Sequence, residues 1–156
     1  MIQRIQSIYL LIAAIIPVIL LFIPIGILES AMGSYSYNSF NVKIINTDVV
    51  IIGTSYNALL LILSSILSFA TIFFYKKRKL QVRIINFNML AILGALLSMF
   101  YLYPQVIFPK NPVLSGTILD FNFAMLIALF TALGLFFAKR AILKDEALVK
   151  STERLR

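Results

Sequence analysis

The sequence predicts an all-α integral membrane protein: an antiparallel four-transmembrane-helix bundle with a small β-hairpin in the first outer loop. Two observations predict it. Hydrophobic residues make up 61% of the 156 residues and the mean hydropathy is +0.97, whereas soluble domains use roughly 45–50% apolar residues. The apolar residues also gather in four almost uncharged runs, each long enough to supply the roughly 20 residues of a membrane-crossing helix. We place these spans at residues 8–28, 54–75, 84–103 and 120–138.

The distribution of charge predicts the orientation of these spans. The N-terminus, the 76–83 connection and the tail after residue 138 together hold twelve Lys and Arg against three Asp and Glu. The opposite side holds two basic residues against three acidic ones. Because basic residues in short flanking loops stay in the cytoplasm, both termini are expected there. The first apolar run exceeds the 7–15 residues of a signal-peptide core, so we expect it to remain as an uncleaved span.

Residues 29–53 form the first outer loop, and their pattern predicts strands. Polar and aromatic residues alternate over Ser34–Tyr37, as in a half-buried strand. Two β-branched runs, Asn41–Ile45 and Val49–Ile52, flank the turn-forming triplet Asn46–Asp48. The loop is therefore expected to fold as a small β-hairpin, of two or three strands, on the outer mouth of the bundle.

Local signals also predict where the spans begin and end. The second should start at Thr54 or Ser55, with a hydroxyl as N-cap, since a helix starting at Val49 would exceed the bilayer thickness. Pro104 should end the third span, and the prolines that follow it should keep the second outer loop irregular. Asp120 should cap the fourth span at the outer interface.

The residue types present exclude several kinds of chemistry. The chain has no cysteine and no histidine, which excludes disulfides, thiolate nucleophiles and zinc sites built on these residues. It also has no catalytic triad, phosphate-binding loop or metal-spaced ligand set. We therefore expect no catalytic residue, no cofactor and no metal. Asn86, Asn88 and Asn122 are interpreted as interhelical or interfacial hydrogen-bonding groups.

Two basic segments are the candidate contact sites. The connection between the second and third spans contains Lys76, Lys77, Arg78 and Lys79, which act as a topology signal and are expected to meet anionic lipid headgroups. The tail, residues 139–156, has no Gly or Pro and reads as a helix that continues the fourth span. Its expected partner-contact residues are Lys139, Arg140, Lys144, Asp145, Glu146, Arg154 and Arg156.

Two interpretations of the tail stay open. It could be a solvated, charged helix that orients the bundle, or it could dock a cytoplasmic partner through a narrow apolar stripe that includes Ile142 and Leu148. The partner could be a cytoplasmic protein, lipid headgroups or the ribosome, whose RNA phosphates attract basic residues without sequence preference. No DNA partner is expected.

The two ends of the chain carry a family resemblance. Residues 1–11 read MIQRIQSIYLL and residues 144–156 read KDEALVKSTERLR. These stretches resemble a bacterial family of short four-pass membrane proteins classed as a domain of unknown function, found in a lineage of Gram-negative bacteria. The resemblance implies an inner-membrane location and supplies no activity, ligand or catalytic residue. The layout, with strands between the first and second spans, also looks like a claudin-type bundle, a likeness of architecture only.

These observations predict a non-enzymatic accessory or scaffold subunit of a larger inner-membrane complex, in contact with lipids and with other membrane-protein subunits. The alternative is a small-molecule or ion transporter or channel with a site near Asp120, the only acidic residue within the predicted limits of a span. A lipid-modifying enzyme ranks last, because the chain offers no nucleophile, metal site or pair of acids.

Overall fold

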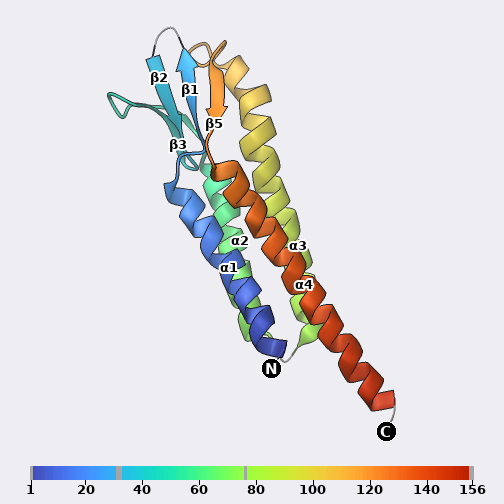
Figure 1. Ribbon diagram of the computed structural model, residues 1–156. Coiled ribbons are helices and arrows are strands. Elements are labelled where there is room, and N and C mark those ends of the chain that lie inside the picture. The colour runs from blue at the N-terminus through green and yellow to red at the C-terminus, as the bar shows by residue number, and fades with distance from the viewer. Residues whose placement is uncertain (1, 31–32, 76, 155–156) are drawn as a thin grey trace.

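Four antiparallel helices form an elongated bundle that carries a β-sheet at one end (Figure 1). The computed structural model describes residues 2–30, 33–75 and 77–154, without the side chains of residues 2–5, 125 and 149–154. The helices are α1 (Ile2–Phe22), α2 (Ser55–Phe73), α3 (Arg78–Leu97) and α4 (Ala124–Arg154). We call the end with the sheet the sheet end, and the end with the α2–α3 connection the basic end.

The sheet has five antiparallel strands in the order β4-β3-β2-β1-β5. The predicted strands of the first loop are confirmed, and the predicted turn is tight, with Asp48 at φ 54°. The prediction of a small hairpin was incomplete, because the second loop contributes a strand that pairs with β1. The strands are β1 (Gly26–Ser30), β2 (Gly33–Tyr37), β3 (Asn41–Ile44), β4 (Val50–Gly53) and β5 (Ile118–Phe121).

The predicted limits of the first and fourth spans were wrong, because residues at their outer ends pair as strands β1 and β5. Helix α1 ends at Phe22, and residues 26–30 form β1, which pairs on one side with β2 and on the other with β5. Asp120 lies in β5 opposite Ile27, and α4 begins at Ala124. Asp120 is therefore an exposed strand residue and caps no helix. Short apolar runs fit a buried strand as well as a helix, and here pairing between distant segments decides.

The helix after α3 continues past Pro104, contrary to the prediction that this proline ends it. A π-helical segment, Ser98–Ile107, and a short 3₁₀ turn extend the helical path to Lys110. In a π-helix each N–H bonds to the carbonyl five residues earlier, so the wider turn moves the proline ring away from the carbonyl that it would strike in an α-helix. Proline has no N–H, however, so the carbonyl of Met99 loses its helical donor.

Tyr37, a buried residue of β2, supplies the missing donor. Its hydroxyl donates to the Met99 carbonyl at 3.2 Å and accepts from Asn57 Nδ2 at 2.9 Å. Ser98 Oγ in turn donates to the Asn57 side-chain carbonyl. This cluster joins the sheet to α2 and to the π-helical segment. It is a buried polar contact between the sheet and the bundle.

The start of α2 differs from the prediction in its capping. Thr54 occupies the N-cap position, yet its side chain makes no capping hydrogen bond. Its hydroxyl donates to the Asn38 carbonyl at 2.8 Å, and its backbone N–H bonds to the Phe40 carbonyl. The residue therefore fastens the helix start to the loop between β2 and β3.

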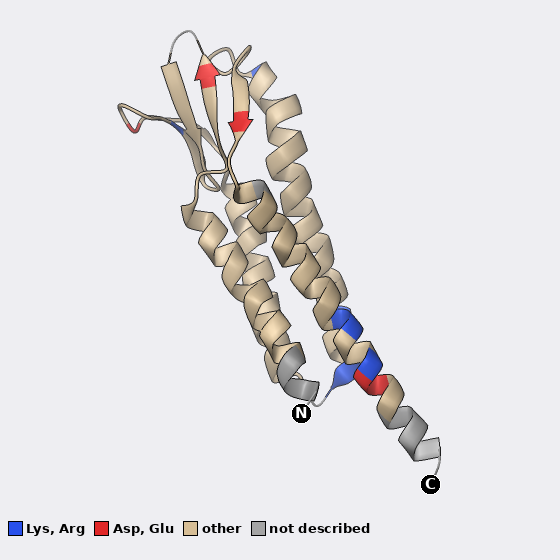
Figure 2. Ribbon diagram, viewed as in Figure 1, with Lys and Arg blue, Asp and Glu red and all other residues tan. Residues whose placement is uncertain are grey.

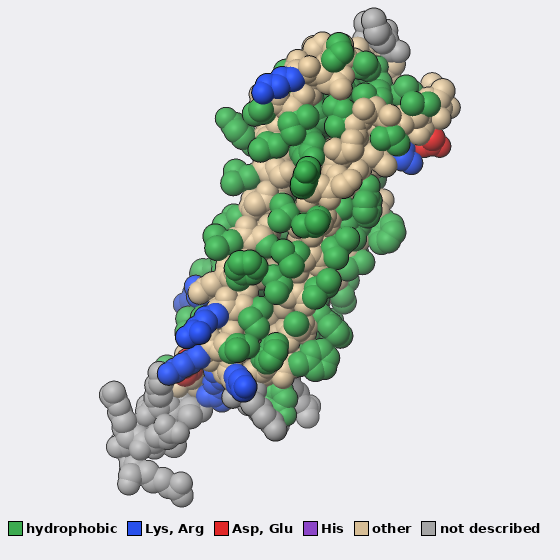
Figure 3. Space-filling model, turned by 180° about the vertical axis from the view of Figure 1, so that it is seen from behind, with side chains coloured by type: hydrophobic (Ala, Val, Ile, Leu, Met, Phe, Trp, Pro, Cys, Tyr) green, Lys and Arg blue, Asp and Glu red, His purple; other side chains and the backbone are tan. Residues whose placement is uncertain are grey.

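Helix α2 is largely polar on its buried face and apolar on its exposed face. The buried residues of α2 are mostly small or polar, whereas its exposed residues are large and apolar. Figure 3 shows hydrophobic side chains along most of the length of one face of the molecule. The buried set of α2 is Asn57, Ala58, Leu61, Ser64, Ser68 and Thr71; the large exposed set is Tyr56, Leu59, Ile62, Ile66, Phe69 and Phe73.

The buried polar residues pair α2 with α3. Asn88 Nδ2 donates to the Ser64 carbonyl at 3.1 Å and to Ser68 Oγ at 2.7 Å. Nearer the basic end, Gln81 Nε2 donates to the Thr71 carbonyl at 3.1 Å. The interpretation of Asn88 as an interhelical hydrogen-bonding group is confirmed. These pairs set the register of the two helices, because a slip would bury each polar group without a partner.

Candidate functional site at the basic end of the bundle

Most of the described Lys and Arg residues gather at the basic end (Figure 2). Lys77 and Lys79 are exposed at the start of α3, and Arg140 and Lys144 are exposed on α4. Lys139 is half-buried. Both predicted basic segments therefore lie at the same end of the molecule, on neighbouring helices. Lys76 and Arg156 lie outside the described residues, and Arg154 lies in α4 with its side chain undescribed.

An ion pair joins the two segments. Arg78, at the first position of α3, places one guanidinium nitrogen 3.1 Å from a carboxylate oxygen of Asp145 on α4. The other nitrogen donates to the Asp145 backbone carbonyl at 3.5 Å. Both side chains are mostly buried, at 26% and 13% exposure. The Asp145 carboxylate, predicted as a partner contact, is therefore engaged by Arg78 within the chain.

Replacing Arg78 by methionine should destabilise the protein by about 1–3 kcal/mol, below the roughly 3–5 kcal/mol of a fully buried pair. The Asp145 carboxylate, 13% exposed, would lose its countercharge. Thermal unfolding in detergent, followed by circular dichroism, measures the change. Lys79→Met, which removes an exposed charge from the same turn, is the control. Equal melting temperatures for the two variants would contradict the structural role of the pair.

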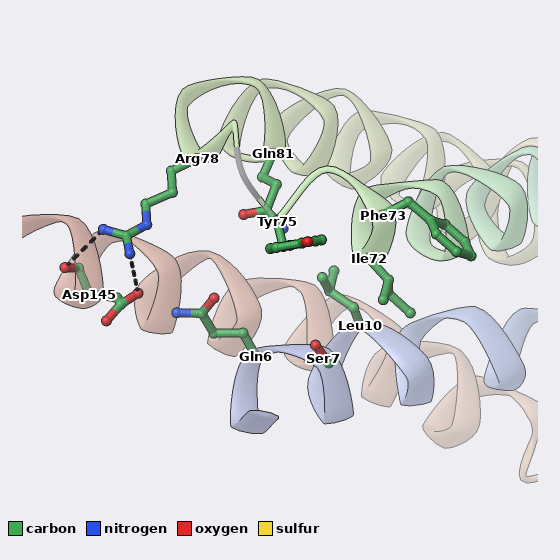
Figure 4. A pocket seen from close by; sticks show the side chains of 9 residues that line it. All are labelled: Gln6, Ser7, Leu10, Ile72, Phe73, Tyr75, Arg78, Gln81 and Asp145. Carbon is green, nitrogen blue, oxygen red and sulfur yellow. Dashed lines mark hydrogen bonds and ion pairs between the residues drawn. The ribbon is translucent and has the colours of Figure 1, made fainter. Parts of the chain in front are cut away.

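A cavity of about 480 Å³ lies next to this ion pair, between α1, the α2–α3 connection and α4. Its charged and its large apolar side chains lie toward opposite ends (Figure 4), with Ser7 beside Leu10 and Tyr75 between the ends. Arg78 and Asp145 lie at one end, Gln6 and Gln81 lie further in, and the apolar residues lie at the end nearer the middle of the bundle. The apolar end is formed by Leu10, Ile72 and Phe73.

The two glutamines hold the helices around the cavity. Gln6 Nε2 donates to the Ala141 carbonyl at 3.3 Å, so α1 is tied to α4. Gln81 Nε2 donates to the Thr71 carbonyl, so the start of α3 is tied to the end of α2. Both side chains are buried. Sequence reasoning missed these residues, although an isolated polar side chain beside an apolar run was a usable signal.

The helix surfaces define the class of this protein. Three helices among the described residues are long and apolar enough to cross a membrane: Ser55–Phe73, Arg78–Lys110 and Leu126–Leu148. Their large apolar side chains face outward, which is stable only when the surroundings are themselves apolar. The chain is a multi-pass membrane protein.

The family follows from the comparison with family models. Residues 2–155 match the family described as "Domain of unknown function (DUF4293)", and the chain belongs to this family. No curated protein matches the sequence. Neither result supplies an activity.

Proposed function

We propose that this protein is a non-enzymatic accessory or scaffold subunit of a larger complex in the bacterial inner membrane. In this proposal α1 is the fourth crossing, since its apolar part, Gln6–Phe22, is about 26 Å long at 1.5 Å per residue. The basic end faces the cytoplasm, because basic flanking residues are retained there. Both termini are then cytoplasmic, and the sheet lies on the outer side.

The observation that supports a scaffold role is the length of α4. Its 31 residues correspond to about 46 Å, whereas a hydrocarbon core is about 30 Å thick. The surplus lies at the basic end, where the C-terminal part of α4 extends beyond the other helices (Figure 1). The Arg78–Asp145 ion pair holds this part at its base. A helix held in this way can present a rigid surface to a cytoplasmic partner.

Charge is the expected basis of recognition at this surface. Arg140 and Lys144 are exposed on α4, so they are available to an acidic partner. Ile142, part of the predicted apolar stripe, is fully buried against the bundle. Ile142 is therefore unavailable for helix-in-groove docking, while Leu148 of the same stripe is exposed. The surface proposed for the partner is the basic face of α4. Lys77 and Lys79 are exposed next to it and suit lipid headgroups.

Purification from native membranes in a mild detergent tests the proposal. The test variant replaces Arg140 and Lys144 by glutamine and keeps both members of the Arg78–Asp145 pair. The matched control replaces Lys43 and Lys110, the two basic residues at the sheet end, by glutamine. A stoichiometric partner should accompany the wild type and the control and be lost from the test variant. Purification of the wild type alone would contradict the scaffold proposal.

The transport alternative gains no support from the position of Asp120. The residue is exposed on β5, whereas the polar interior of the bundle is formed by uncharged amides and hydroxyls. A proton or cation pathway through a membrane normally uses ionisable residues that face the interior of the bundle. Uptake abolished by Asp120→Asn, with folding intact, would be the result in its favour.

A further inference from the structure

We propose that the cavity at the basic end binds one anionic phospholipid, with its phosphate at the start of α3 and an acyl chain between α1 and α2. The inference deepens the lipid-headgroup role proposed above for Lys77 and Lys79. It adds a defined site of about 480 Å³, which is within the roughly 300–1,000 Å³ of pockets that hold small ligands. Such a site predicts a stoichiometric lipid, in contrast to loose attraction at the membrane surface.

The direction of the cavity matches the direction of a lipid in a bilayer. Its apolar end, at Leu10 and Ile72, points toward the middle of the bundle, and its polar end, at Arg78 and Asp145, lies where the basic residues gather (Figure 4). A phospholipid of the leaflet at the basic end presents its chains and its headgroup in this same order. An apolar ligand without a charged group would leave the polar end unused, and a free phosphate would leave the apolar end empty.

The charge at the polar end is positive. Arg78 compensates Asp145 within the lining. Lys77 and Lys79 do not line the cavity, but both are exposed beside it at the start of α3, where they add two positive charges. Lys77 is the N-cap residue, and no side chain caps the helix there. The Leu80 N–H bonds to the Lys77 carbonyl, so the N–H groups of Arg78 and Lys79, together with the positive end of the helix dipole, are the donors offered to an anion. Phosphate oxygens suit this combination of backbone donors and lysines.

The two buried glutamines, Gln6 and Gln81, lie where the lipid changes from headgroup to acyl chain. Each uses its Nε2 to hold a carbonyl of another helix, and each lines the cavity between the charged end and the apolar end. Each Nε2 carries a second hydrogen, which can be donated to the ester oxygens of a lipid, since the ester region lies between headgroup and chain. The site therefore has a region for each part of the molecule.

Native mass spectrometry of the delipidated full-length protein tests the proposal, with phosphatidylglycerol, phosphatidylethanolamine and inorganic phosphate as separate probes. One phosphatidylglycerol should bind, the zwitterionic lipid should bind more weakly, and phosphate alone should not be retained. Replacing Lys77 and Lys79 by glutamine should weaken binding roughly fivefold per lysine. Ile72→Trp, which fills the apolar end, should abolish it. The matched control is Leu129→Trp on an exposed face of α4, which should bind as the wild type does.

The outcomes separate this inference from the surface role of the lysines. If the lysine variant loses lipid while Ile72→Trp retains it, headgroups bind only at the surface and the cavity proposal is overturned. Equal binding of the two lipids would overturn it as well. A phosphatidylglycerol with a photoreactive acyl chain gives a measurement on the wild type that depends on no variant. It should label the peptide that contains Ile72, and labelling confined to the exposed helix faces would contradict the site.

Discussion

Replacing Gly26 by alanine should detach β5 from the sheet and destabilise the protein by about 3 kcal/mol, at the upper end of overpacking effects. A Cβ atom at this position would lie 2.6 Å from the backbone carbonyl oxygen of Asp120 and 3.0 Å from a methyl carbon of Leu119. The first of these neighbours is backbone, which cannot turn aside as a side chain can. Relief therefore requires β1 and β5 to separate.

Disulfide trapping measures this separation directly. The chain has no cysteine, so cysteines introduced at the paired positions Ile27 and Asp120 can form the only disulfide. They should cross-link in the wild-type background, because paired strands bring Cα atoms within the roughly 4.4–6.8 Å that a disulfide spans. Gly26→Ala should suppress the cross-link. Gly53→Ala, whose nearest neighbour would be 3.9 Å away, is the control, and suppression by both variants would contradict the close-approach argument.

Tyr37→Phe should produce the second large loss of stability, about 1–3 kcal/mol for each buried polar group that it leaves unpaired. Two groups are affected. The Met99 carbonyl loses the donor that replaces the missing N–H of Pro104, and Asn57 Nδ2 loses its acceptor. Circular dichroism melting in detergent is the appropriate measurement, since the chain has no tryptophan to report unfolding. Tyr101→Phe, at an exposed ring, should leave the melting temperature unchanged.

The pH dependence of stability, compared between the wild type and Tyr37→Phe, separates the contribution of the tyrosine hydroxyl from that of the ring. Burial raises the pKa of Tyr37 well above its usual range, and the hydrogen bond from Asn57 offsets only part of this. The folded state holds the proton of the Tyr37 hydroxyl more tightly than the unfolded state does. The stability that this hydroxyl contributes is therefore fully present below a pH of about 10 and falls as pH rises further. The wild type should lose its advantage over Tyr37→Phe in this alkaline range. A stability difference that stays constant up to pH 12 would contradict the assignment.

Several elements were predictable because the signal lies in neighbouring residues. The strands within residues 33–53 show alternation, β-branching and a turn-forming triplet, so their type is local information. The helical tail follows from uninterrupted helix-forming residues and continues α4 up to Arg154. The interhelical role of Asn88 follows from the cost of an unpaired amide in an apolar environment.

Other elements were unpredictable because they depend on segments far apart in the chain. Gly26–Ser30 extends an apolar run that reads as helix, and it becomes a strand only because residues 118–121 pair with it. Pro104 reads as a helix end, yet the helix continues. Tyr37, 62 residues before Met99 in the chain, supplies the donor that the Met99 carbonyl lacks. The candidate site was predicted in part. Both basic segments were identified from the sequence, but their contact through Arg78 and Asp145 was not.

The sequence by itself determined that this is a membrane protein with its basic residues on one side, because apolar content and charge asymmetry are properties of composition and order. It also determined most strands of the first loop. Only the tertiary structure decided the fifth strand, the ion pair between α3 and α4, and the cavity beside it. Each of these requires backbone or side-chain groups from distant segments to satisfy one another, and no local pattern specifies which distant group is brought near.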